Sequence, residues 1–433
     1  MTLLLPLHGL GSRQDLPLPF PAVVGGAVVV LLVSFGVLAF AWRTSRWSGH
    51  PGGRALPRLS RFIDSKWTRG LVAALGLFAF AWVGMALWFG QDRVTNPVFG
   101  FTYVWVWVGL VPLSLLLGPV WRTLNPLRTL HRGMVHLGLP ADGFRPLSAS
   151  LWQRLGQYPA ALALIGFGWL ELVQPDNNTL AVLQGWWLAW VIGCLGGAVV
   201  FGERWLAASD PFEVYATTVA RASWWQRPLL VNPLRNLSTS TAPHGTWAVV
   251  TALLGITAFD GFTGTTWWVR TTQTSALPGT FWGTLGLLGM VALVGVTLAL
   301  GARGLGRLTG RTFDRIAASV IPIVIGYAVA HYLSLLVLEG QRTLINLSDP
   351  LGLGWNTFGT AELGINLFWL ETPAITALIQ LIAIVGGHVI GVLVAHEVSL
   401  TLLPPKRRTS GKLAMLLVMI GYTCGGLVLL FSP

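Results

Sequence analysis

Residues 316–400 decide the fold, because they hold two long apolar stretches joined by a polar loop. The first stretch ends in AHYLSLLVLEGQ (330–341), with His331 inside the apolar run. The second contains GGHVIGVLVAHEVSL (386–400), with His388 inside it. A helix of about 20 apolar residues spans a bilayer, so both stretches are predicted to cross a membrane. Ionisable side chains at membrane depth cost free energy and by default mark a functional site.

The same apolar pattern recurs along the whole chain. Of its 433 residues, 53% are hydrophobic and only 10% are charged. This composition predicts an all-α fold, a polytopic integral membrane helical bundle of about 10 transmembrane helices. The predicted spans are roughly Phe20–Trp42, Leu71–Phe89, Phe101–Val120, Pro159–Val173, Leu180–Gly202, Trp247–Phe262, Thr280–Ala302, Ile316–Leu338, Pro373–Leu400 and Leu413–Phe431.

The basic residues predict the orientation of these spans. Alternate connectors hold 24 of the 28 Lys and Arg residues, and the positive-inside rule places those connectors in the cytoplasm and both termini outside. The net charge of +12 therefore reports contact with anionic inner-leaflet lipid at the plasma membrane of a bacterium, not binding of nucleic acid. The basic connectors are 43–70, 121–158, 202–246, 303–315 and 401–412.

Residues 1–19 are predicted to form an outer segment, and residues 20–433 a single transmembrane domain. The inner connectors 121–158 and 202–246 read as amphipathic interfacial helices. The tetrapeptide NPLR occurs in both connectors, which suggests an internal duplication. An Asx–Pro pair is a helix-start signal, and the connectors contain such pairs at Asn125-Pro126 and Asp210-Pro211.

Three ionisable residues are expected at similar depth in the outer half of the membrane. At about 1.5 Å per residue, His331, Asp260 and Glu171 lie roughly 22, 20 and 18 Å from the inner ends of their spans. Together they could act as a general acid/base set, line a proton path, or bind a divalent metal ion such as Zn, Mn, Fe or Cu. The alternatives are hydrogen-bonded helix packing for the histidine and an interfacial position for the two carboxylates.

His388 is a further candidate metal ligand with His331 and Asp260, although its expected depth is about 10 Å below His331. His396 follows two turns later, so one metal ion cannot take both as neighbouring ligands. His396 is expected near the inner headgroups, beside Glu397. A simpler interpretation makes His388 a helix-packing residue.

The loop at 339–372 is long and rich in turn residues, so it is predicted to be an ordered lid over the outer half. The N-terminal segment could cover the same region. An outer arginine could hold an anion, or it could pair within the lid with an acidic neighbour. The candidate lid and ligand residues are His8, Arg13, Asp15, Glu339, Arg342 and Asp349.

A resemblance covers nearly the whole chain. It rests on HGLGSRQDLPLP, NPLRTLHR, SDPFEVY, NPLRNL, AFDGFTGT, AHYLSLLVLEGQ, SDPLGLGWNTFGTA and GHVIGVLVAHE. Together these resemble an actinobacterial family of polytopic membrane proteins that commonly carries the label fenitrothion hydrolase. The resemblance implies hydrolysis of the aryl ester of an organophosphate triester, and it carries over no catalytic residues. The family often shows Asp after the last His of the GH…AH motif, where this chain has Glu397.

Two hypotheses therefore stand. In the first, Asp260, His331 and Glu171 hold a metal or activate water in a membrane-embedded phosphotriester hydrolase that takes a small apolar substrate. In the second, the chain is a transporter or permease for a small ligand, or an accessory membrane subunit of a larger complex whose partner is unknown. Polar residues at mid-membrane and glycine-rich spans are typical of transporters.

Overall fold

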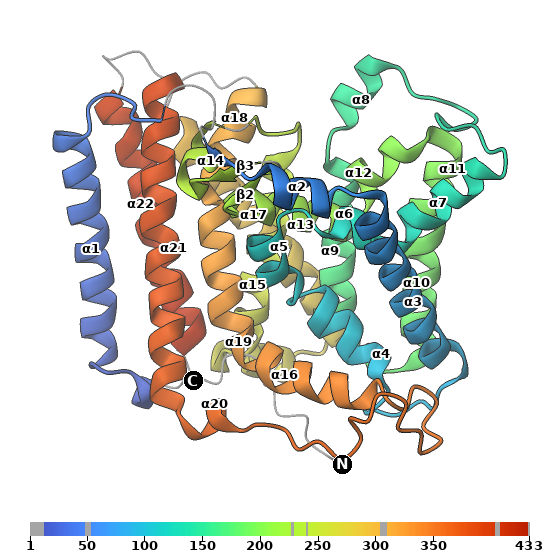
Figure 1. Ribbon diagram of the computed structural model, residues 1–433. Coiled ribbons are helices and arrows are strands. Elements are labelled where there is room, and N and C mark those ends of the chain that lie inside the picture. Colours follow the sequence, from blue (N-terminus) through green and yellow to red (C-terminus); the bar gives the residue numbers. More distant parts are fainter. Residues whose placement is uncertain are drawn as a thin grey trace. The chain divides into compact units, whose positions relative to one another are not determined.

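The computed structural model describes residues 13–47, 53–226, 229–239, 241–303, 310–402 and 408–431. Helices make up most of these residues, as the all-α class predicts (Figure 1). The chain forms two compact units. The first unit comprises residues 1–52, 232–335 and 367–433, and the second comprises residues 53–231 and 336–366.

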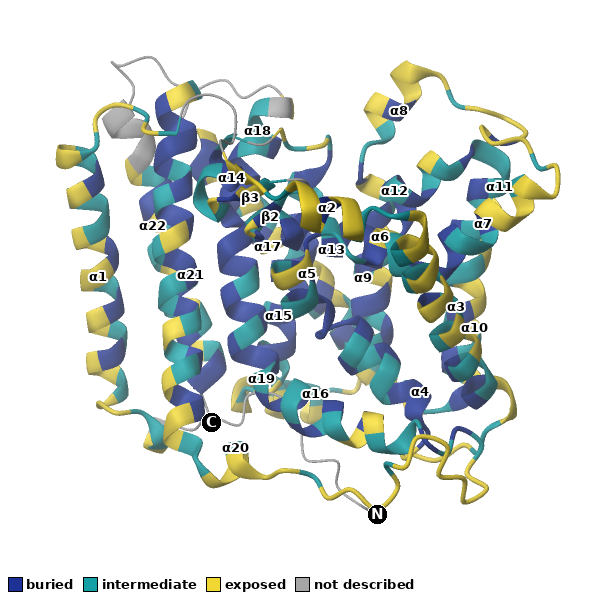
Figure 2. Ribbon diagram, in the orientation of Figure 1, coloured by how far each residue is buried: buried dark blue, intermediate teal, exposed yellow. Residues whose placement is uncertain are grey.

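The first unit is built from long helices around α15 and α19. In α15, 78% of the residues in its most apolar 18-residue stretch are buried. In α1 the corresponding share is 22%, and this helix shows an exposed face (Figure 2). Its elements are η1 (Arg13–Asp15), α1 (Phe20–Ala41), α14 (Pro233–Thr239), α15 (Thr246–Thr263), α16 (Thr266–Thr274), α17 (Gly279–Arg303), α18 (Gly310–Ala317), η6 (Ala318–Val320), α19 (Ile321–Asn346), α20 (Phe368–Glu371), α21 (Pro373–Leu402) and α22 (Arg408–Phe431). The helix α19 is divided between the units, because its residues from 336 onward belong to the second unit.

The second unit mixes apolar helices with short helices and one small sheet. In the sheet, order β1-β3-β2, Leu230 of β3 pairs antiparallel with Arg54 and Trp225. The elements are β1 (Gly53–Ala55), α2 (Pro57–Ile63), α3 (Lys66–Phe89), α4 (Pro97–Gly100), η2 (Phe101–Val106), α5 (Leu110–Leu117), α6 (Trp121–Leu124), α7 (Pro126–His136), α8 (Ala149–Leu155), α9 (Tyr158–Leu172), α10 (Leu180–Val191), η3 (Ile192–Gly196), α11 (Gly197–Phe201), η4 (Glu203–Trp205), α12 (Leu206–Ser209), α13 (Pro211–Val219), η5 (Ala220–Ala222), β2 (Trp225–Gln226) and β3 (Leu229–Val231).

Eight helices of the described residues are long and apolar enough to cross a membrane. The segments Pro97–Val106 and Leu110–Leu117 form a ninth if this pair, bent by 46°, is one span. The remaining predicted span, Pro159–Val173, corresponds to the helix α9, which has only 15 residues. At about 1.5 Å per residue, α9 is roughly 22 Å long, less than the hydrocarbon thickness of about 30 Å.

The two Asx–Pro pairs begin helices as the sequence predicts. Asn125 caps α7 by accepting hydrogen bonds from the backbone N–H groups of Leu127 and Arg128. Asp210 caps α13 in the same way through the N–H of Phe212. The helix α13 is not an interfacial helix, however, because every residue in it except Thr217 is buried. Connector 202–246 therefore contributes a core helix to the second unit.

In the first unit, glycines bring the backbones of α19 and α21 into contact. A Cβ atom on Gly387 would lie 2.6 Å from the carbonyl oxygen of Pro322 and 3.3 Å from Cα of Gly326. Only glycine permits this approach, which fixes the spacing of the two helices. The side chain of Gln380 adds a hydrogen bond of 2.9 Å to the carbonyl oxygen of Ala330.

Candidate functional site

The first unit joins two of the predicted site residues in a buried pair. Nε2 of His331 on α19 lies 3.0 Å from Oδ2 of Asp260 on α15. The exposed fractions are 3% for His331 and 9% for Asp260. Both residues lie on long apolar helices, and their side chains are largely shielded from solvent. The sequence groups these two residues by their depth along each helix, and the structure places their side chains in contact.

A third helix, α22, packs beside this pair. A Cβ atom on Gly261 would lie 3.0 Å from the hydroxyl oxygen of Tyr327 and 3.3 Å from Cβ of Leu429. The Tyr327 ring stacks on the His331 ring at a centroid distance of 5.9 Å. The Tyr327 hydroxyl is buried and has no hydrogen-bond partner among the described residues. An unpartnered buried hydroxyl costs free energy, so it is a natural partner for a proton donor or acceptor.

The chemistry open to this pair is proton binding. A carboxylate beside a neutral imidazole carries one negative charge, and the addition of one proton makes the pair neutral overall. Exchange of that proton needs no other reactant.

The other predicted members do not join the pair into a metal site. Glu171 ends α9 in the second unit, where its carbonyl oxygen accepts a hydrogen bond from Asn177. His388 is 2% exposed, and its Nδ1 lies 2.8 Å from the carbonyl oxygen of Ile384 on its own helix. In the described ranges, no three His, Cys, Asp or Glu residues form a group that could hold a metal ion. Asp260 and His331 alone provide two ligands, fewer than the three or four typical of a zinc site.

His396 and Glu397 have a structural explanation in the first unit. Nε2 of His396 lies 2.8 Å from the carbonyl oxygen of Trp42, the residue after α1. The Glu397 carboxylate accepts hydrogen bonds from the Trp42 indole, from the Ser45 hydroxyl at 2.7 Å and from the Arg46 N–H at 3.1 Å. These two residues therefore anchor the end of α1 to α21.

The predicted lid starts later than expected, because α19 continues to Asn346. Glu339 and Arg342 lie on this helix and form an ion pair of 2.6 Å. Asp349 opens the loop and accepts hydrogen bonds from the N–H groups of Leu353 and Gly354. Partial burial opposes ionisation of Asp349, but these and other backbone N–H groups lower its pKa. His8 and the side chain of Arg13 lie outside the described residues, and Asp15 belongs to η1.

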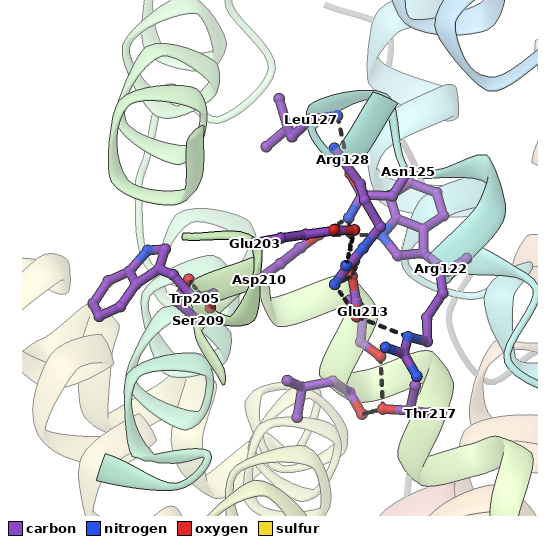
Figure 3. A network of polar contacts seen from close by, with 12 residues as sticks. Arg122, Asn125, Leu127, Arg128, Glu203, Trp205, Ser209, Asp210, Glu213 and Thr217 are labelled. Atoms are coloured by element: carbon purple, nitrogen blue, oxygen red, sulfur yellow. Dashed lines mark hydrogen bonds and ion pairs between the residues drawn. The ribbon is translucent and has the colours of Figure 1, made fainter. Parts of the chain in front are cut away.

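The second unit contains a buried charge network that sequence reasoning missed (Figure 3). The guanidinium of Arg128 binds Glu213 through Nε at 3.0 Å and Nη2 at 2.6 Å. Its Nη1 lies 2.6 Å from Glu203, which also binds Arg132 at 2.8 Å. Partial burial opposes ionisation of Glu203, but the two arginines hold its pKa below the usual value.

Asp210 occupies the other side of the same network. It accepts hydrogen bonds from Asn125 at 2.6 Å and from the indoles of Trp121 and Trp190 at 3.3 Å. Complete burial raises the pKa of Asp210 to about 6, and the charge of Glu213 adds to the rise, while the N–H donors oppose it. The network thus ties the first turns of α7 and α13 together.

One signal in the sequence could have revealed this network. Both Asx–Pro helix starts carry a charged residue three positions after the cap, Arg128 after Asn125 and Glu213 after Asp210. The charges are opposite, so the two helix starts complement each other. The paired residues are far apart in the chain, and amphipathic patterning alone assigns such charges to a solvent-exposed face.

Comparison with known proteins identifies no relative of this chain. The chain matches no family model, no curated protein and no solved structure.

Proposed function

We propose that this protein is a multi-pass membrane transporter in which the Asp260–His331 pair binds and releases a proton during transport. The observation that carries the proposal is the 3.0 Å contact between a carboxylate and an imidazole, both buried, on two long apolar helices. Carboxylates and imidazoles placed in this way are the usual elements of proton relays in pumps and transporters.

The position of the pair also suits coupling between proton binding and helix movement. α15, α19 and α22 meet at Gly261, Tyr327 and Gly426, where a Cβ atom on Gly426 would lie 3.3 Å from the Tyr327 ring. Packing this close is sensitive to small shifts of one helix. A change in the charge of the pair therefore alters the electrostatic energy at a point where three helices are in contact.

The experiment is proton flux into proteoliposomes that hold a pH-sensitive dye, driven by a potassium diffusion potential. We expect flux with the wild type and its loss in Asp260→Asn and His331→Gln. Thr257→Val is the matched control, because Thr257 lies one turn away on α15 and its hydroxyl donates a hydrogen bond to the Leu253 carbonyl oxygen of the same helix. If both pair variants conduct like the wild type, the pair does not carry the proton. In coupled flux, the proton moves only together with a transported ligand. To detect such coupled flux, the assay is repeated in the presence of a set of small apolar compounds.

Hydrolysis is the second candidate, and the same contact favours it. A carboxylate-oriented imidazole can take a proton from water, whose oxygen then attacks phosphorus while the aryloxide leaves. Ser334 lies three residues after His331 on α19, and its buried hydroxyl has no hydrogen-bond partner among the described residues. Three residues place the two side chains on one helix face, so Ser334 could be the nucleophile in place of water.

Purified protein without any ion gradient separates the two candidates. Release of the nitrophenol from fenitrothion by wild type, lost in His331→Gln, would support the hydrolase that the family resemblance implies. Loss in Ser334→Ala as well would identify the serine as the nucleophile, whereas retained activity would favour direct attack by water.

A further inference from the structure

We infer that the second unit contains a binding site for an uncharged aromatic molecule, in a cavity lined by tryptophan rings. The cavity has a volume of about 270 Å³. An apolar cavity of about 150 Å³ is large enough to bind benzene in another protein, so this one has room for a fused or substituted ring. The inference does not depend on the proton pair, which belongs to the other unit.

The lining of the cavity argues for an apolar ligand. Apart from the indole N–H groups, Thr102 supplies the one polar side-chain group among the described residues of the lining, and its hydroxyl oxygen already accepts a hydrogen bond from the Trp187 indole at 3.3 Å. A charged ligand would lose its hydration without gaining a counter-ion in contact. The rest of the lining is aliphatic or aromatic and includes five indoles, those of Trp105, Trp121, Trp186, Trp187 and Trp190.

Four of the five indole N–H groups donate to protein acceptors, which leaves ring surface for the ligand. Trp121 and Trp190 donate to Asp210, and Trp105 donates to the carbonyl oxygen of Gly340 at 3.1 Å. The polar edges of these rings are therefore satisfied by the protein. The charge network of Figure 3 thus fixes two of the rings that line the cavity, because Asp210 is held by Asn125.

The arrangement of the rings favours an aromatic ligand over a flexible chain. Phe80 stacks on Trp187 with an interplanar angle of 15°, and Trp186 stacks on Trp190 with an angle of 11°. These are rigid, nearly parallel ring pairs. An added ring gains about 0.5–1.5 kcal/mol per aromatic contact beyond the burial of its area, which an acyl chain does not.

The test uses 1-bromonaphthalene, whose heavy atom quenches tryptophan fluorescence on contact, with the full chain in phosphatidylcholine nanodiscs. We expect saturable quenching in the wild type. The variant Ala79→Phe fills the cavity from α3 and should weaken binding at least tenfold. Ala74→Phe is the matched control on the same helix, because Ala74 is exposed and does not line the cavity. It should bind like the wild type.

A second filling variant, Leu347→Trp, enters the cavity from the segment after α19 and protects the test against misfolding of the first. Unchanged thermal unfolding of each variant is the folding control. Quenching that does not saturate, or that is equal in wild type and both filling variants, would overturn the inference. Quenching by lipid with brominated acyl chains that falls in both filling variants, without saturable bromonaphthalene binding, would assign the cavity to a lipid chain instead.

Discussion

Arg128 shows how a single residue holds part of the second unit together. Its side chain is 5% exposed and contacts Glu213, which is 1% exposed, and Glu203, which is 36% exposed. A buried ion pair gives little net stability compared with an apolar substitute, but the loss of one partner leaves an uncompensated charge. The cost therefore depends on which partner is removed and on whether both are removed together.

Arg128→Met is accordingly expected to destabilise the protein by about 3–5 kcal/mol. Arg132→Met is the matched control, because Arg132 binds the same Glu203 from a side chain that is 53% exposed, and it should cost less than about 1 kcal/mol. The double variant Arg128→Met with Glu213→Met should recover much of the loss. Denaturant unfolding in detergent measures all three, and equal effects of the two arginine variants would contradict this account.

Asp210 gives a prediction for pH. Its pKa of about 6 lies above the value of about 3.9 for an unfolded aspartate, so the folded chain binds this proton more tightly. This group therefore adds stability as the pH falls from 7 through 6 toward 4, and the gain is lost as the pH rises again. The thermal unfolding temperature of Asp210→Asn should lack this rise, whatever its value at pH 7. A rise of the same size in both proteins would exclude Asp210 as its source.

The contact between α19 and α21 belongs to the scale of whole elements. A methyl group on Gly387 would meet the Pro322 carbonyl oxygen at 2.6 Å, so Gly387→Ala must push the helices apart, at a cost of about 1–3 kcal/mol. Gly386 is the matched control, since a Cβ atom there meets nothing within 4 Å. Alanine at 386 should be neutral or slightly stabilising, because alanine favours a helix more than glycine does. Equal thermal shifts in the two variants would contradict a backbone contact at Gly387.

Elements differ in how far the sequence predicts them. The starts of α7 and α13 follow from Asn125-Pro126 and Asp210-Pro211, because cap and proline chemistry is local. The Asp260–His331 pair follows from depth along each helix. The burial of α13 does not follow, since its polar residue Glu213 finds its partner far along the chain, and a hydropathy pattern cannot distinguish a satisfied buried charge from a solvated one. Nor does depth reveal that Glu171 belongs to a different unit.

At the scale of the molecule, the two units share an order of features that supports an internal duplication. In each unit, NPLR begins a helix through its asparagine side chain, which accepts the N–H of the leucine at 3.0 Å in α7 and 2.9 Å in α14. The next long helix ends near a carboxylate, Glu171 or Asp260. That helix then packs against the segment that carries AAS, on α12 in one unit and on α18 and η6 in the other. The two units share the order of these features but not the lengths of the loops between them.

The short helix α9 decides how many times the chain would cross a membrane. Five of the predicted spans lie between Asp142 and Glu362, and they are formed by α9, by α10 with η3 and α11, and by α15, α17 and α19. If all five cross, the two residues lie on opposite sides, and the basic connectors place Asp142 inside. If α9 is too short to cross, four crossings remain and both residues lie on one side. A shortfall of about 8 Å can be met by local thinning of the bilayer, so we expect α9 to cross.

Single cysteines at these two exposed positions test this arrangement. The native Cys194 and Cys424 are first replaced by alanine, because both are free thiols. In right-side-out vesicles, a membrane-impermeant maleimide should label Glu362→Cys but label Asp142→Cys only after the vesicles are opened. The reverse pattern would contradict the orientation from basic residues. Labelling of both without opening would mean an even number of crossings between them, and α9 would then be a buried helix like α13 instead of a span.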